Sequence, residues 1–258
     1  MTKVLVAGAI PEAGLNQLKA HFEVDMYTGD KLITEDELIE RIKDADGLIS
    51  LLSTNVSEKV IEAAPNLKII ANYGAGFNNI DIQAARARGI DVTNTPIAST
   101  NATADLTMGI LLAVARRIPE GDQLCRTKGF NGWSPLFFRG REVSGKTIGI
   151  IGLGEIGSAV ARRAKGFDMD ILYSGPSRHE DKEQELGARY VSQDELLKQA
   201  DFVTINCSYN ESMPHMIDYD EIKKMQPTAY LINASRGPIV YEAELVKALQ
   251  DGLIEGAA

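Results

Sequence analysis

Three glycines at the spacing GxGxxG, Gly152, Gly154 and Gly157, are the first residues of this sequence that could organise chemistry. They follow the apolar run Thr147–Ile151 and open a helical pattern, the context in which this spacing binds a dinucleotide. The first glycine permits a tight turn, the second lets a pyrophosphate approach the backbone, and the third lets helix and strand pack closely. The phosphates would lie over the helix N-terminus. The alternative is a tight turn with no ligand.

The next expected strand lacks the acidic residue that would bind a free ribose 2′-hydroxyl about 20 residues after the glycines. Ser174 stands at that position, and Ser177 and Arg178 follow it. Two hydroxyls and a guanidinium suit a 2′-phosphate, because arginine pairs with phosphate and no carboxylate repels it. These residues favour NADP over NAD. The alternative is a dual-specific or NAD-preferring site whose Arg178 faces solvent.

Two more features come directly after expected strands. Arg236 follows the run Ala229–Asn233, and the tight turn around it could direct the guanidinium into a cleft at the carboxyl edge of a sheet. A surface arginine is an equal alternative from the residues alone. Gly74 and Gly76 follow an earlier strand and allow backbone N–H groups to converge on an anion, or they form a plain turn.

Strand-like and helix-like segments alternate along the chain, which predicts parallel sheets with helices on both faces. Thr95-Pro96 interrupts the alternation, Thr100–Ile118 reads as one helix that ends before Pro119, and Glu120–Arg141 is looser. The expected strands are 4–7, 24–27, 47–52, 67–72, 90–94, 147–151, 170–173, 190–191, 202–206 and 229–233, with the start of another in "LIEGAA". The expected helices outside 100–118 are 12–22, 35–42, 58–63, 82–88, 155–167, 180–186, 195–200 and 242–250.

Composition narrows the classes of function. The chain has 258 residues, 44% of them apolar and 24% charged, as in ordinary globular proteins. Its net charge of −9 argues against a nucleic-acid partner or an anionic membrane surface. Two cysteines cannot form a disulfide framework or a metal site, so we expect a cytoplasmic protein without metal. No apolar stretch is long enough to span a membrane.

The sequence resembles the D-isomer-specific 2-hydroxyacid dehydrogenases, and most closely the glyoxylate/hydroxypyruvate reductase branch. The resemblance extends over the whole chain and is carried by "NYGAGFNNID", "NTPIASTNATADLTMGILLAVARR", "GKTIGIIGLGEIGSAVARRAKGF" and "LINASRGPIVYEAELVKALQDGLIEGAA". It implies an α/β protein with a flavodoxin-like substrate domain at residues 1–99 and a Rossmann dinucleotide-binding domain at 100–258, with the active site between them. It also implies hydride transfer between NAD(P)H and a small 2-oxo or 2-hydroxy acid.

The resemblance assigns roles residue by residue. Arg236 matches the catalytic arginine that grips the 2-oxo acid, and the amides of Ala75 and Gly76 match the loop that holds the substrate carboxylate. The residues that match coenzyme contacts are Thr103, Gly152, Gly154, Glu155, Ile156, Gly157, Ser174, Ser177, Arg178, Cys207, Ser208, Ala234 and Ser235.

The sequence also departs from the family pattern. Ser208 stands where many members carry proline, and Met213 where threonine is common. The family's catalytic Glu and His, and the helix that completes its substrate domain, follow the segment at which this sequence stops. We therefore expect a C-terminally truncated chain that binds NADPH but reduces glyoxylate very slowly, because it lacks the proton donor.

Other functions remain open. A dinucleotide-binding, corepressor-like module would use the same fold without catalysis. A phosphoglycerate, D-lactate or formate dehydrogenase would use the same scaffold for another acid. The family's usual homodimer is expected here too, and the aromatic segment Gly132–Gly140 could serve that contact or pack within its own chain. None of His21, His179 and His215 is a clear acid-base group, and His215 reads as an ordinary loop residue.

Overall fold

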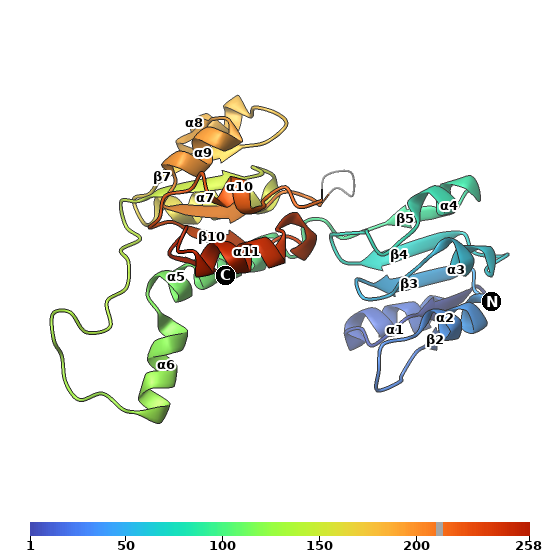
Figure 1. Cartoon of the computed structure of the whole chain (residues 1–258). Helices are drawn as coiled ribbons and strands as arrows, with labels where there is room; N and C mark the ends of the chain where they lie inside the picture. The colour runs from blue at the N-terminus through green and yellow to red at the C-terminus, as the bar shows by residue number, and fades with distance from the viewer. Residues whose placement is uncertain (210–213) are drawn as a thin grey trace. The chain divides into compact units, whose positions relative to one another are not determined.

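Short runs of Val, Ile and Leu form two separate parallel sheets, one in the N-terminal unit, Met1–Ser99, and one in the C-terminal unit, Thr100–Ala258 (Figure 1). The computed structural model describes residues 1–209 and 214–258. The α/β fold with two parallel sheets that the sequence predicts is confirmed.

The sheet of the N-terminal unit has the order β2-β1-β3-β4-β5, which is the flavodoxin-like order. Right-handed crossovers place the first helix on one face and the next three on the other. The strands are β1 (Lys3–Val6), β2 (Glu23–Met26), β3 (Gly47–Leu51), β4 (Ile69–Tyr73) and β5 (Asp91–Thr93). The helices are α1 (Glu12–His21), α2 (Glu35–Ile42), α3 (Glu58–Glu62) and α4 (Ile82–Ala87).

The core of this unit lies between the sheet and helices α2, α3 and α4. Leu5, Leu48 and Ile70 project from three neighbouring strands into it and are almost completely buried. Helix α2 begins with a capping box, in which the Thr34 hydroxyl accepts from the Glu37 amide and the Glu37 carboxylate accepts from the Thr34 amide. The core and the cap together fix α2 against the sheet.

The sheet of the C-terminal unit has the order β11-β10-β9-β6-β7-β8, and all its strand pairs are parallel. The chain order reverses between β6 and β9, as in the Rossmann fold, and ligands bind at the carboxyl ends of strands beside such a reversal. The strands are β6 (Thr147–Ile151), β7 (Asp170–Ser174), β8 (Ala188–Tyr190), β9 (Phe202–Ile205), β10 (Tyr230–Asn233) and β11 (Gly256–Ala257).

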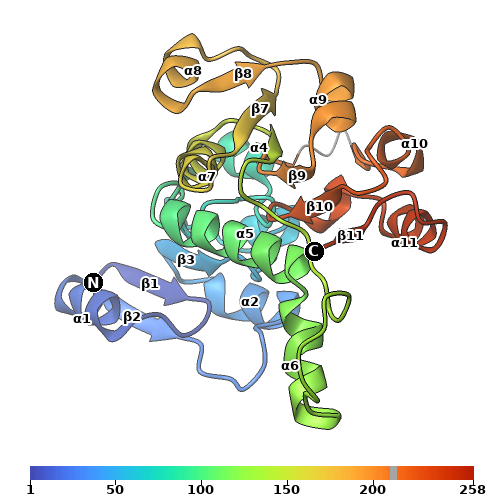
Figure 2. The ribbon, with the colours of Figure 1, turned by 90° about the vertical axis from the view of Figure 1, so that its left-hand side faces the viewer.

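Helices cover both faces of this second sheet. On one face α5 (Thr100–Ala115) packs against α7 (Glu155–Lys165), as Figure 2 shows, and α8 (Glu180–Leu186) follows β7. The other face carries α9 (Gln193–Gln199), α10 (Tyr219–Ile222) and α11 (Glu242–Gln250). Two apolar cores result, one on each side of the sheet.

The region around Pro119 differs from the prediction. The helix expected over 100–118 ends at Ala115, and a second helix, α6 (Ile118–Thr127), extends into the segment from Glu120 onward that was expected to be loose. Arg117 takes a left-handed conformation with φ of 56° and breaks the path between them. Proline lies in the first turn of α6, where its missing N–H would have no helical partner, so it starts a helix instead of ending one.

We predict that Leu48→Ala lowers the free energy of unfolding of the N-terminal unit by about 2–5 kcal/mol, because it opens a cavity in a closed core. Leu32→Ala is the control, since Leu32 is 64% exposed in the same unit. Urea denaturation followed by circular dichroism measures both. Equal midpoints for the two variants would contradict this account of the core.

Candidate functional site

The three glycines of the turn after β6 have different roles: two are required by the backbone, and one borders open space. Gly152 has φ of +96°, and a Cβ there would lie 2.7 Å from the Cα of Cys207. A Cβ on Gly157 would collide with the carbonyl oxygen of Gly152. A Cβ on Gly154 would meet nothing within 4 Å. The backbone therefore requires the first and third glycines, whereas the second borders open space that a dinucleotide phosphate fits.

Helix α7 presents an uncapped N-terminus to that space. Gly154 is its N-cap residue and brings no side-chain acceptor for the first-turn amides of Glu155, Ile156 and Gly157. The Ser158 hydroxyl donates to the Gly154 carbonyl oxygen at 2.6 Å and fixes the start of the helix. Free first-turn amides and the helix dipole favour an anion.

The carboxyl end of β7 lies beside this turn. The Gly152 amide donates to the Ser174 carbonyl oxygen at 2.9 Å, and Ser174 is 4% exposed. Its hydroxyl has no hydrogen-bond partner within the part of the chain that the structure describes. A buried hydroxyl without a partner is uncommon, and a bound ligand would satisfy it. Ser177 and Arg178 are exposed on the loop that follows.

Arg178 is paired with a carboxylate that the sequence analysis did not single out. Its Nε and Nη2 atoms each donate to Glu183 of α8 at 2.9 Å, and the hydroxyl of Tyr173 donates to the same carboxylate at 2.7 Å. These contacts lower the pKa of Glu183 to about 2, mainly through Arg178. The guanidinium is therefore held by its own chain and does not move freely in solvent.

The ends of β9 and β10 supply further polar groups to the same edge. The strand register aligns Ile151, Ile205 and Asn233, so the residues after them are neighbours. Asn206 accepts from the Thr204 hydroxyl at 3.0 Å, whereas its buried Nδ2 has no partner within residues 1–209 and 214–258. These unsatisfied atoms and the open space at Gly154 fit a dinucleotide along this edge.

The turn after β9 meets the turn after β10. The Ser235 hydroxyl donates to the Cys207 carbonyl oxygen, and burial raises the pKa of the Cys207 thiol. Ser208 is exposed and Ala234 is half-buried. Thr103 is half-buried on α5, where its carbonyl oxygen accepts from the Thr107 hydroxyl at 2.8 Å.

Arg236 begins the short 3-10 helix η1 (Gly237–Ile239), and its side chain is exposed. Asn233 shapes the turn before it, since its Oδ1 accepts from the Ser235 amide at 3.0 Å and its Nδ2 donates to the Arg236 carbonyl oxygen at 2.9 Å. The guanidinium donates to the Ser235 carbonyl oxygen at 3.2 Å. Arg236 thus stands beyond the carboxyl end of β10, on the same edge as the glycine-rich turn.

Asparagine side chains position the loop at Gly74–Gly76 in the N-terminal unit. Asn72 is 2% exposed and donates to the Gly76 carbonyl oxygen at 2.6 Å, while Asn94 donates to the Ala75 carbonyl oxygen at 2.7 Å. Ser50 and Asn79 both donate to the Asn72 Oδ1 and hold that side chain in place. The two carbonyl groups are therefore engaged, and among the described residues the N–H groups of Ala75 and Gly76 have no backbone acceptor.

His215 is exposed and stacks on Tyr241, with ring centroids 4.3 Å apart. Met213, one of the two departures from the family pattern, lies outside the described residues. Within the described residues no cluster of three or more His, Cys, Asp or Glu side chains could hold a metal ion. No described helix combines the length and apolar character needed to cross a membrane.

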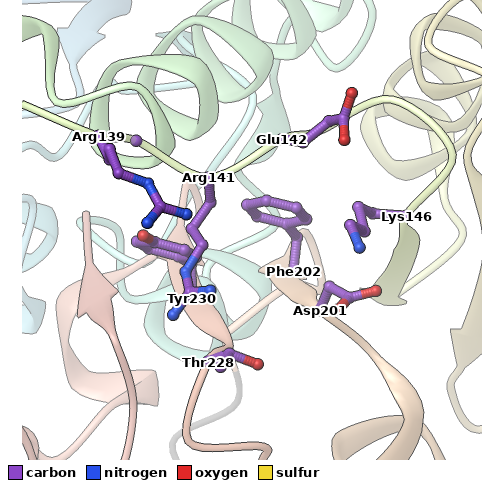
Figure 3. Close-up of a pocket in the computed structure, with 9 residues that line it drawn as sticks. Arg139, Arg141, Glu142, Lys146, Asp201, Phe202, Thr228 and Tyr230 are labelled. Atoms are coloured by element: carbon purple, nitrogen blue, oxygen red, sulfur yellow. The ribbon is translucent and has the colours of Figure 1, made fainter. Parts of the chain in front are cut away.

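A separate cavity of about 360 Å³ lies at the opposite, amino edge of the second sheet (Figure 3). Its walls come from residues 139–142, from Lys146, and from the starts of β9 and β10 with the residues just before them. Arg141 is paired with Glu255 at 2.8 Å, and Asp201 accepts from the Thr147 amide at 2.9 Å, so these polar groups serve the fold. None of the site residues that the sequence predicts lines it.

Comparison with known proteins agrees with this architecture. Residues 108–258 match the family described as "D-isomer specific 2-hydroxyacid dehydrogenase, NAD binding domain". A Staphylococcus aureus (strain USA300) protein named for the 2-hydroxyacid dehydrogenases is 70% identical over 258 residues, covering 100% of this chain and 81% of that protein.

Solved structures extend the similarity to both units. A crystal structure of a Thermus thermophilus protein matches with a TM-score of 0.92 and 36% identity, covering 99% of this chain and 80% of the other. A glyoxylate reductase from Paecilomyes thermophila matches with a TM-score of 0.88 and 30% identity, again covering 99% and 80%. The chain belongs to the D-isomer-specific 2-hydroxyacid dehydrogenase family and carries its NAD-binding domain.

Proposed function

We propose that the chain transfers a hydride between NAD(P)H and a small 2-oxo or 2-hydroxy acid, with glyoxylate or hydroxypyruvate as the substrate. The observation that carries this proposal is the joint position of Arg236 and the open space at Gly154 on one edge of the second sheet. The similarity to a glyoxylate reductase supports the choice of acid.

The roles of the chain's own groups follow from their chemistry. A bound dihydronicotinamide supplies the hydride. Arg236 binds the carboxylate of the 2-oxo acid and stabilises the negative charge that develops on the carbonyl oxygen. The amides of Ala75 and Gly76 are the proposed donors to the carboxylate, in a loop that Asn72 and Asn94 hold through its carbonyl oxygens.

The coenzyme contacts extend along the carboxyl edge of the second sheet. The amides of Glu155 and Ile156 face the pyrophosphate, and Ser174, Ser177 and Arg178 bind the adenosine ribose, with NADP favoured over NAD. The remaining contacts, on the nicotinamide side and along the coenzyme, come from Thr103, Cys207, Ser208, Ala234 and Ser235.

A second copy of the chain is the proposed protein partner. In the segment Gly132–Gly140, Trp133 is 81% exposed, Leu136 80% and Phe137 43%. Helix α6, which precedes this segment, contains no buried residue. Exposed apolar side chains in such number mark a protein contact, and a homodimer would cover them.

We predict that Gly154→Ala weakens coenzyme binding and leaves the melting temperature unchanged, because the added methyl group meets only open space in the protein. Gly152→Ala is the matched variant: it strains the backbone at positive φ, collides with Cys207, and should lower the melting temperature. Fluorescence titration with NADPH and thermal denaturation distinguish the two. Unchanged NADPH affinity in a folded Gly154→Ala protein would exclude the coenzyme from this turn.

Arg178→Gln should weaken NADPH binding by about tenfold, because a charge-assisted contact to phosphate contributes about 1.5 kcal/mol or more. NADH affinity should stay nearly constant, since NADH has no 2′-phosphate. Titration of the wild type and the variant with both coenzymes measures the effect. A wild-type preference for NADH would overturn the proposed role of Ser174 and Arg178.

The substrate proposal is tested by following coenzyme oxidation with glyoxylate, hydroxypyruvate, pyruvate and bulkier 2-oxo acids. We expect the two favoured acids to react fastest. Arg236→Ala should lower kcat/KM by about 10²-fold or more without changing NADPH affinity. Arg189→Ala is the control, because Arg189 is an exposed arginine paired with Glu195 elsewhere in the same unit. Equal loss in both variants would remove Arg236 from the reaction.

A further inference from the structure

Glu183 occupies the centre of a small network beside the proposed 2′-phosphate position. Its carboxylate accepts two hydrogen bonds from Arg178 at 2.9 Å and one from the Tyr173 hydroxyl at 2.7 Å. Tyr173 is completely buried in the β7 strand, and its hydroxyl also accepts from the His179 amide at 2.8 Å. The network therefore connects the coenzyme-side loop to the interior of the sheet.

Arg178 cannot offer all its donors to a phosphate while this network persists. A guanidinium has five N–H groups in a planar fork, and Glu183 takes one from Nε and one from Nη2. Nη1 lies 3.7 Å from a carboxylate oxygen of Glu180, an exposed residue. A phosphate must therefore displace Glu183 or bind through the donors that remain.

Glu183 is not free to move away when a phosphate arrives. Its side chain is only 14% exposed, whereas that of Arg178 is 56% exposed. Loss of Arg178 would leave a largely buried carboxylate with the Tyr173 hydroxyl alone, and such a group is costly to leave without its charge partner. The pairing also keeps Glu183 ionised, since its pKa is about 2.

We propose that Glu183 is a positioning residue that acts through Arg178 and limits the preference for NADPH over NADH. It holds the guanidinium at the end of β7 and at the same time competes with the 2′-phosphate for its donors and its charge. NADH has only a 2′-hydroxyl at this place, and the Ser174 hydroxyl, which has no partner among the described residues, can bind either coenzyme. The inference rests on the proposed coenzyme site.

The test is a comparison of NADPH and NADH dissociation constants for the full chain and for Glu183→Gln. Glutamine keeps an acceptor for Arg178 and Tyr173 and removes the competing charge. We expect NADPH to bind about 3- to 5-fold more tightly and NADH to change by less than about twofold, as for the removal of one partly exposed ionic contact. Glu183→Met should act in the same direction if the glutamine variant does not fold.

Glu185→Gln is the matched control, because it removes the same charge from α8 at a side chain that is 62% exposed and pairs with Arg162. It should leave the ratio of the two constants unchanged. An unchanged or weaker NADPH affinity in Glu183→Gln, or an equal gain for NADH, would overturn the role of Glu183. Failure of the wild-type chain to bind either coenzyme would instead overturn the proposed function.

Discussion

The close approach of Gly152 to the backbone of Cys207 is the constraint on which the ligand-binding edge of the second sheet depends. Because residue 152 has no side chain and a positive φ, β6 can end directly beside the turn that follows β9. The same turn donates its amide to Ser174 at the end of β7. Three strand ends are thus held together by one residue, and α7 can start at the point where the strand order reverses.

The N-terminal unit reaches a similar result with amides instead of a glycine. Asn72 is buried within its strand, yet its side-chain oxygen and nitrogen both have partners, so its burial carries no penalty for unsatisfied groups. Asn72 holds the Gly76 carbonyl oxygen and Asn94 holds that of Ala75, so the loop is fixed, and its amides are the proposed donors to the substrate. A carboxylate binds well to converging amides, and a rigid loop loses little entropy on binding it.

The sequence was sufficient for the architecture because apolar strand-like runs alternate with helix-like segments along both halves of the chain. The sequence was also sufficient for the glycine-rich turn, because the GxGxxG spacing after a strand predicts a tight turn into a helix. It failed at Pro119, because a proline is compatible with both the end of one helix and the start of the next, and only the left-handed Arg117 decides. The sequence analysis did not identify Asn72 or Glu183. Their roles depend on hydrogen-bond partners outside their own strand or helix, which a local sequence pattern does not predict.

The two edges of the second sheet show that a cavity does not by itself identify a functional site. The amino edge holds a cavity of about 360 Å³, yet Arg141 and Asp201, which line it, have their partners within the protein. At the carboxyl edge, Ser174 and Asn206 keep buried polar atoms without partners in the described chain. A buried polar atom without a hydrogen-bond partner ordinarily lowers the stability of the folded state. In the proposed function the coenzyme completes these atoms of Ser174 and Asn206. Arg178 gives two of its five donors to Glu183 and keeps the others for the same ligand.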